Sequence, residues 1–200
     1  NVLNAALEEP QAFITGYFLS QRFHARPELE IGWKPYVKIW RPAAEYDAHH
    51  LLELFFQPVS DALKTIGVTG TQGKTSTTFL IDAALGEHHS GLIGSMGSKI
   101  DGVPVPTKLT TPEAPAMQAL LARMREQGVR WVSSEVSSQA ISMRRVDGLV
   151  FDVAVFLNLG HDHLDFHGSQ ENYRAAKREL LTPAMSRLAI VNIDDQAGRR

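Results

Sequence analysis

A glycine-rich segment, GVTGTQGKT at positions 67–75, carries residue types that could hold phosphate. Its glycines let the backbone curl so that N–H groups face an anion. The segment follows an apolar run and opens a helical stretch, so the positive end of a helix would face the same anion. In such a loop Lys74 would reach the terminal phosphates and the Thr75 hydroxyl would hold magnesium. A glycine-rich turn without a ligand is the structural alternative, but Gly, Lys and Thr all fall in register for phosphate.

The carboxylate of Glu135 lies within an apolar run at 129–136, where we expect a strand to end. Ligands bind at the carboxyl ends of strands in open parallel sheets, and a carboxylate there can hold Mg²⁺ beside nucleotide phosphates. Ser137 and Ser138 follow and could donate hydrogen bonds to substrate oxygens. A solvated or ion-paired glutamate, followed by serines that merely end a strand, is the structural alternative.

Histidine and aspartate gather in the segment HDHLDFH at 161–167. This spacing is near the HxHxDH metal-ligand run of metallo-β-lactamase-like hydrolases, which makes a dinuclear zinc hydrolase a rival interpretation. That run needs histidine at position 166, where this chain has Phe166, and the third histidine comes one residue late. The rival also leaves the glycine-rich loop unexplained. A purely structural His163 remains open.

Lys177 is expected on a helical face that it shares with Tyr173, Leu180 and Leu181, by three- and four-residue spacing. A lysine that is partly buried has a lowered pKa and a nucleophilic amine. The alternative is that the side chain extends past its apolar neighbours into water.

The elements that must position these residues follow a regular order after residue 64. Helical spacing of apolar residues predicts a helix over 113–127, which Thr111-Pro112 starts and Gly128 ends. Alternating strands and helices predict an α/β domain with a parallel sheet covered on both faces. The predicted strands are 65–69, 91–93, 129–136, 151–157 and 188–193.

The chain divides into two predicted parts, an N-terminal segment at 1–63 and an ATPase-like domain at 64–200. The first part holds most of the aromatic residues, and only a helix around 51–63 is predicted there. The chain begins with Asn1 rather than Met, which suggests a fragment of a longer protein.

Composition excludes several classes of protein. The net charge of −2 gives no basic field for nucleic acid, and there is no apolar stretch long enough to span a membrane. Without cysteine there is no disulfide framework and no thiolate zinc site, which fits a cytoplasmic protein.

Several segments, in order, resemble the Mur ligases. The shorter loop GTQGKT at 70–75 is similar to the family's GTNGKT, whereas the general nucleotidase pattern would need glycine at Val68. The loop alone marks the wider superfamily, including folylpolyglutamate synthases. Five further segments resemble the family in the same order. Among them, the combination of EVSS with DHLDFHG is most similar to the members that add the third amino acid, diaminopimelate or lysine, to UDP-MurNAc-L-Ala-D-Glu. The five segments are TTP at 110–112, EVSS at 135–138, NLGHDHLDFHG at 158–168, YRAAK at 173–177 and NIDD at 192–195.

The resemblance implies an incomplete P-loop ATPase domain of a ligase that uses ATP and Mg²⁺. Such a ligase activates a carboxylate as an acyl phosphate and couples it to an amine. It implies that Lys74, His163 and Lys177 are catalytic, with Lys177 carbamylated by CO₂ and binding a second Mg²⁺ with His163. The implied nucleotide contacts are Gly70, Thr71, Gln72, Gly73, Lys74, Thr75, Ser76 and Asn192; the implied metal ligands are Thr75, Glu135, His163 and Lys177; and the implied contacts to a UDP-MurNAc-dipeptide-like substrate are Thr110, Thr111, Ser137 and Arg145.

The chain departs from the family's pattern at several positions near substrate or phosphate. Gln72 stands for asparagine, Gln139 for histidine, and Gly160-His161 for Ser-Arg, while residues 1–63 contain no Asp-Ser-Arg segment of the kind that holds uridine. Two alternatives therefore stay open, a related ligase with a different acceptor and a non-catalytic nucleotide-binding module.

Overall fold

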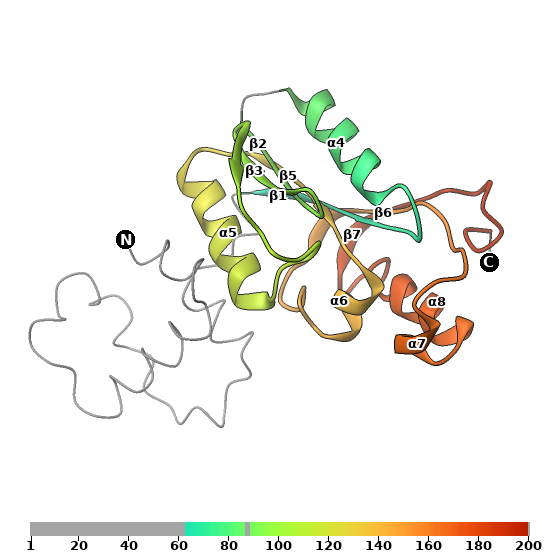
Figure 1. Ribbon diagram of the computed structural model, residues 1–200. Helices are drawn as coiled ribbons and strands as arrows, with labels where there is room; N and C mark the ends of the chain where they lie inside the picture. Colours follow the sequence, from blue (N-terminus) through green and yellow to red (C-terminus); the bar gives the residue numbers. More distant parts are fainter. Residues whose placement is uncertain (1–62, 87–88, 200) are drawn as a thin grey trace, which may run out of the picture.

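The computed structural model describes residues 63–86 and 89–199, and these form one seven-stranded sheet with helices on both faces (Figure 1). The strand order is β4-β3-β2-β5-β1-β6-β7. The strands are β1 (Lys64–Thr69), β2 (Ser90–Gly94), β3 (Gly97–Ile100), β4 (Val103–Val105), β5 (Trp131–Glu135), β6 (Phe151–Phe156) and β7 (Ser186–Val191). The helices are α4 (Lys74–Leu85), α5 (Ala114–Glu126), α6 (Ser138–Ser142), α7 (Leu164–His167) and α8 (Gln170–Glu179).

The strands β2, β5, β1, β6 and β7 pair in parallel, as the sequence predicts for this α/β chain. Val68 of β1 pairs with Glu135 of β5, and Thr69 pairs with Phe156 of β6. This register brings the carboxyl ends of three central strands to the same edge of the sheet. The segments that follow them therefore start side by side.

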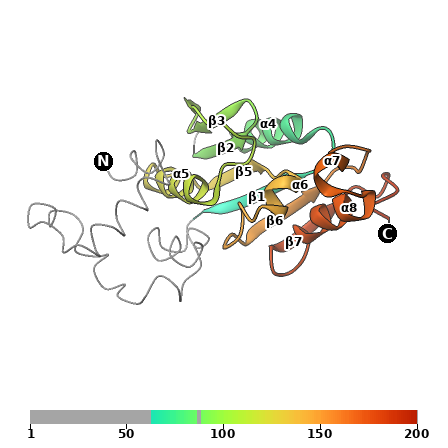
Figure 2. The same ribbon diagram turned by 60° about the horizontal axis from the view of Figure 1, so that its bottom comes forward.

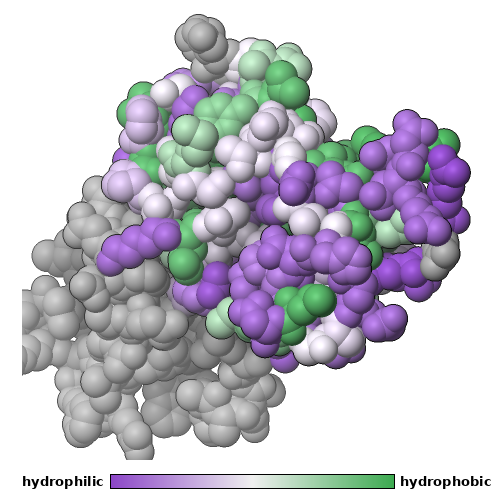
Figure 3. Space-filling view, turned by 45° about the vertical axis from the view of Figure 1, so that its right-hand side comes forward, coloured by the Kyte–Doolittle hydropathy of each residue, from purple (hydrophilic) through white to green (hydrophobic). Residues whose placement is uncertain are grey.

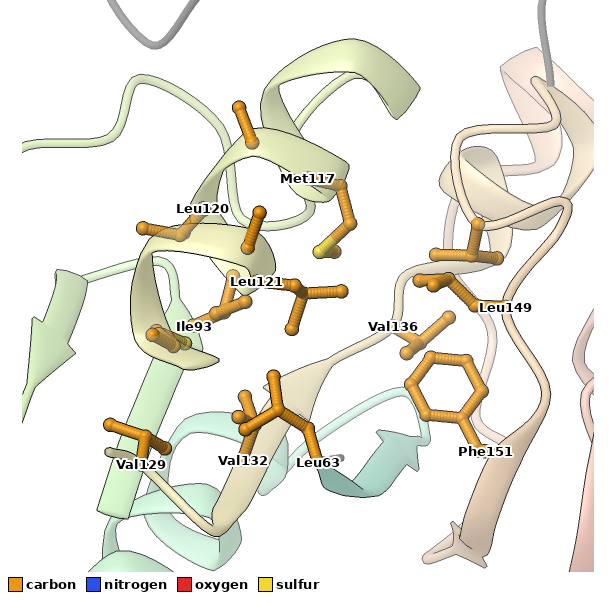
Figure 4. Packing of buried hydrophobic residues seen from close by; sticks show 14 of the residues in the cluster. Leu63, Ile93, Met117, Leu120, Leu121, Val129, Val132, Val136, Leu149 and Phe151 are labelled. Atoms are coloured by element: carbon orange, nitrogen blue, oxygen red, sulfur yellow. The ribbon is translucent and has the colours of Figure 1, made fainter. Parts of the chain in front are cut away.

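Helices α4 and α5 cover opposite faces of the sheet (Figure 1). Ser133 of β5 donates to the carbonyl of Thr78 in α4, at 3.2 Å. Its neighbour Val132 points the other way, as successive strand residues do, and packs in the cluster below α5 with Leu121 (Figure 4). The four apolar residues whose spacing predicts α5 are all buried. Burial of each such side chain contributes about 1.5–3 kcal/mol to the free energy of unfolding. The four residues are Met117, Leu120, Leu121 and Met124.

Helices α6, α7 and α8 gather near the carboxyl edge of the sheet (Figure 2). Ser169 caps the N-terminus of α8, and its Oγ accepts from the N–H of Asn172 at 3.1 Å. Its inward face carries Tyr173 and Lys177, both buried. Hydrophilic side chains gather over the outer surface of α7 and α8 (Figure 3). The apolar spacing around Lys177 thus marks the face that packs inward.

The hairpin of β3 and β4 was not predicted from the sequence. These strands are only four and three residues long, too short for a periodic signal. Its turn carries a recognisable pair, Asp101-Gly102, and both residues have positive φ, 50° and 79°. Asp-Gly is typical of such tight hairpin turns. The helix predicted at 51–63 and the division at 63 lie in or beside residues outside the described part of the chain. No helix in the described ranges is long and apolar enough to cross a membrane.

Candidate functional site

The glycine-rich loop lies at the carboxyl edge of the sheet, between β1 and α4. Gly73 has φ 84°, a left-handed conformation that glycine adopts without strain, and directly precedes α4. The first N–H groups of a helix have no partner within it, so the start of α4 offers them to an anion. Gly70 lies close to the residue that follows β6, since a Cβ added at Gly70 would lie 2.9 Å from Cβ of Leu157. Two of the loop's glycines are therefore required by its path.

Lys74 folds back over the loop. Its Nζ donates to the carbonyl of Gly70 at 2.8 Å and of Thr71 at 3.1 Å. Burial lowers the pKa of Lys74, while the nearby charges of Glu135 and Asp162 act in the opposite direction. The ammonium thus lies within the loop, and its contact with phosphate stays a prediction.

Asn158, which follows β6, holds the glycine-rich loop by side-chain hydrogen bonds. Its Oδ1 accepts from the N–H groups of Thr71 and Gln72, both at 3.0 Å, and its Nδ2 donates to the carbonyl of Gln72 at 3.0 Å. The Thr71 side chain adds contacts to Tyr173 Oη at 2.9 Å and to the N–H of Gly160 at 2.8 Å. The loop is therefore held in shape by β6 and α8, a role of Asn158 that the sequence pattern did not indicate.

We predict that Asn158→Ala weakens Mg·ATP binding about tenfold. The change removes three hydrogen bonds that position the loop, each contributing about 1 kcal/mol. We expect about half of this total, about 1.4 kcal/mol or tenfold, to appear as lost affinity, because the rest acts on the stability of the loop in the free chain. Isothermal titration against Asn172→Ala checks this, since the Asn172 side chain donates to the carbonyl of His167 and does not touch the loop. Equal affinities for the two folded variants would contradict the fastening role.

Glu135 is buried, 1% exposed, beside two hydroxyl groups. Thr75 Oγ1 donates to Oε2 at 3.1 Å, and Ser95 donates to Oε1 from both its N–H and its Oγ, at 2.9 Å each. The backbone of Gly94 lies against this carboxylate, and a Cβ there would collide with Oε1. A carboxylate with two hydroxyls is an oxygen set that suits Mg²⁺, which takes few protein ligands and completes its shell with water and phosphate. Ser95 was missed in the sequence, although it follows a strand end.

Lys177 reaches the same loop from α8. It is only 2% exposed, and its Nζ donates to the carbonyl of Gly70 at 2.8 Å, the oxygen that also accepts from Lys74. Its Nζ lies 4.6 Å from the centre of the Tyr173 ring. Burial, and then the charge of Lys74, lower its pKa to about 7. The alternative of a lysine extending into water is therefore wrong.

The histidine segment lies on α7 and the loop before it. His163 has φ 52°, directly precedes α7, and has its ring centre 6.2 Å from that of Tyr173. His167 is buried, with Nε2 3.0 Å from Ser138 Oγ, and its pKa is lowered by burial and by neighbouring positive charge. Within the described ranges no three or more His, Cys, Asp or Glu side chains are grouped to hold a metal ion. The convergence of His163 with Glu135 stays a prediction.

The residues expected to bind substrate are already engaged within the chain. Thr111 Oγ1 donates to the carbonyl of Glu135 at 2.8 Å and accepts from the N–H of Ser137 at 3.1 Å. Ser137 Oγ accepts from the N–H of Ala140, which starts α6. Arg145 forms an ion pair with Glu113 at 2.9 Å. Their proposed substrate contacts, and that of Thr110, therefore stay predictions.

Asn192 follows β7 at the same edge of the sheet. Its Nδ2 donates to the carbonyl of Leu157 at 2.9 Å, while its side chain is exposed. Its position next to the segment after β6 is compatible with a nucleotide contact, which stays a prediction.

Comparison with known proteins matches residues 68–200 to the Mur ligase middle domain. The chain is 53% identical over 140 residues to the UDP-N-acetylmuramoyl-L-alanyl-D-glutamate--2,6-diaminopimelate ligase of Corynebacterium glutamicum, covering 68% of this chain and 27% of that protein. The Streptomyces avermitilis protein of the same name is 49% identical over 148 residues, covering 74% and 29%. A solved structure of a ligase with this name is similar with a TM-score of 0.63 and 29% identity, covering 76% of this chain and 32% of that one. The chain thus spans about a third or less of the length of these relatives.

Proposed function

The chain belongs to the Mur ligase family, and from that membership we propose that it forms the ATP-binding part of a ligase that joins a substrate carboxylate to an amino-acid amine. The observation that carries the proposal is the convergence of the loop at 70–75 with Glu135. Thr75 of the loop and the carboxylate are joined at 3.1 Å, although 60 residues separate them. A turn without a ligand would not need a buried acid beside the first turn of α4.

The reaction has two steps. An oxygen of the substrate carboxylate attacks the γ-phosphorus of ATP, the bond to the β-phosphate oxygen breaks, and ADP leaves an acyl phosphate. The amine then attacks the acyl carbon, inorganic phosphate departs with the carboxylate oxygen, and the amine loses a proton. The chain's part is to position and neutralise the phosphates. Lys74 turns from the carbonyls of Gly70 and Thr71 toward the γ-phosphate, and the N–H groups at the start of α4 hold its oxygens.

Thr75 and Glu135, with Ser95 at their side, are the proposed magnesium ligands. The ion, when bound, supplies positive charge to the phosphate oxygens. His163 and Lys177 are the proposed ligands of a second ion. For that role the neutral Lys177 amine attacks CO₂, forms a C–N bond and releases one proton, giving an anionic carbamate. Its burial and its lowered pKa support this step.

The substrates are proposed from the relatives, whose names give UDP-N-acetylmuramoyl-L-alanyl-D-glutamate and 2,6-diaminopimelate. We therefore propose that the chain takes part in the synthesis of peptidoglycan precursors and acts in the cytoplasm. Thr110, Thr111, Ser137 and Arg145 are the proposed contacts to the dipeptide, and Asn192 is the proposed contact to the nucleotide base.

A chimera tests the proposed function. In it, residues 63–200 replace the matching segment of the Corynebacterium glutamicum ligase, to which the chain is 53% identical. We expect amide formation between the dipeptide precursor and diaminopimelate, with one phosphate released per amide. Binding of Mg·ATP by a folded chimera that forms no amide would instead favour the non-catalytic module.

A further inference from the structure

An ion pair joins the start of α5 to the segment after α6. Arg145 Nη2 lies 2.9 Å from Glu113 Oε1. The arginine side chain is mostly buried, 14% exposed, whereas the glutamate side chain is 49% exposed. Glu113 is the residue that directly precedes α5, yet its side chain makes no hydrogen bond to the helix N-terminus. Its side chain instead contacts the Arg145 guanidinium.

The guanidinium has hydrogen-bonding capacity that Glu113 does not use. Its Nε is buried and has no hydrogen-bond partner in the described part of the chain. Its Nη1 makes only a long contact, 3.4 Å, to the carbonyl of Thr111. Nε and Nη2 form one edge of the guanidinium, and a carboxylate can accept from both at once. A carboxylate on this edge would keep the charge pairing and add a bond to the unsatisfied Nε–H, which a buried donor needs.

This edge lies close to the proposed site of reaction. Arg145 contacts the carbonyl of Thr111, whose Oγ1 donates to the carbonyl of Glu135. An acceptor that ends in glutamate carries two carboxylates, and amide formation uses only one. When one carboxylate of the acceptor lies at the γ-phosphate, the other carboxylate needs a cation nearby. Arg145 is the cation that Thr111 connects to Glu135 by hydrogen bonds.

We propose, building on the proposed function, that Glu113 occupies Arg145 in the empty enzyme and is displaced by the unreacted carboxylate of an acidic acceptor. The exchange makes Glu113 a residue that determines specificity. A ligand with a free carboxylate replaces the Glu113 contact and gains the Nε bond, whereas a neutral ligand leaves the ion pair in place and gains nothing. Substrate selection thus includes competition with a carboxylate of the chain itself.

The test uses the 200-residue chain, labelled with ¹⁵N, and two probes. The first probe is N-acetyl-L-alanyl-D-glutamate, and the second is its neutral diamide. The Nε–H resonance of Arg145, assigned with Arg145→Lys, reports on the guanidinium. We expect the diacid to shift this resonance and Glu113→Gln to bind the diacid roughly three- to tenfold more tightly than the unaltered chain. The matched control is Glu126→Gln, the same change at an exposed glutamate of α5, which should bind like the unaltered chain.

Three results would overturn the proposal. The first is an Arg145 resonance that does not shift when the diacid is added, and the second is an unchanged or weaker affinity of Glu113→Gln for the diacid. The third is an equal increase in the affinity of Glu113→Gln for the diamide. Titration of the unaltered chain with Mg·ATP separates this outcome from a failure of the proposed function. A chain that binds Mg·ATP but fails the diacid test loses only the role of Glu113. A chain that binds no nucleotide loses the proposed function, whatever the diacid does.

Discussion

Lys74→Ala will reduce Mg·ATP affinity at least a hundredfold, which corresponds to about 2.7 kcal/mol. Lys74 is the cation of the loop nearest to the N-terminus of α4, and charge-assisted bonds to phosphate are among the strongest that a side chain makes. The fold should survive, because the carbonyl of Gly70 keeps its bond from Lys177. Isothermal titration measures the affinity, and thermal unfolding checks that the variant is folded.

Lys64→Ala is the matched control for this change. Lys64 lies at the opposite end of β1, where its exposed ammonium pairs with Asp152 at 3.0 Å. Loss of this pair should leave nucleotide affinity unchanged, since exposed pairs contribute little and the site is a strand length away. Unchanged affinity in a folded Lys74→Ala variant would remove the loop from the proposed nucleotide site.

Lys177→Ala will lower the activity of the chimera at least a hundredfold. The change removes the amine that is proposed to carry the carbamate, and bicarbonate cannot restore it because alanine offers no amine. Formate or acetate should restore part of the activity by supplying a carboxylate in the vacated space. Since its pKa is about 7, the amine is mostly neutral above pH 7 and mostly protonated below it. Formation of the carbamate should therefore fall as pH decreases through 7.

Two further variants separate chemistry from packing at this position. Lys177→Met keeps an unbranched side chain beside Tyr173 but has no amine, so it should be folded and inactive. Arg178→Ala alters the next residue, which is exposed on the same helix, and should keep full activity. Full activity in Lys177→Met would contradict the carbamate role and leave the lysine as a structural donor to Gly70.

The sequence predicted the parts of this site whose signals are local. The loop at 70–75 and Glu135 could be placed because apolar runs locate the strands and parallel strands end at one edge. The spacing of Tyr173, Leu180 and Leu181 left open whether Lys177 is buried or extends into water. The resemblance to the Mur ligases favoured burial, which the structure confirms. The hairpin of β3 and β4 was missed because its strands are too short for a periodic pattern.

Contacts between distant segments could not be predicted in the same way. Ser95 and Asn158 are single polar residues after strands, a common occurrence, and their roles depend on partners 40 and 87 residues away. The ion pair of Arg145 with Glu113 depends on how α5 and α6 are oriented, which no local pattern contains. The identity of the substrate is harder still to predict from local sequence patterns, because it depends on several contacts between distant segments at once.

Isotope transfer tests most directly whether a carboxylate is activated by the γ-phosphate held at this loop. The chimera is supplied with ATP, diaminopimelate and dipeptide precursor whose glutamate carboxylates contain ¹⁸O. Because the acyl phosphate forms through a carboxylate oxygen, we predict that each inorganic phosphate released with an amide carries one ¹⁸O atom, seen as an isotope shift in the ³¹P spectrum. Amide formation with unlabelled phosphate would contradict an acyl phosphate, and phosphate release without amide would contradict the ligase itself.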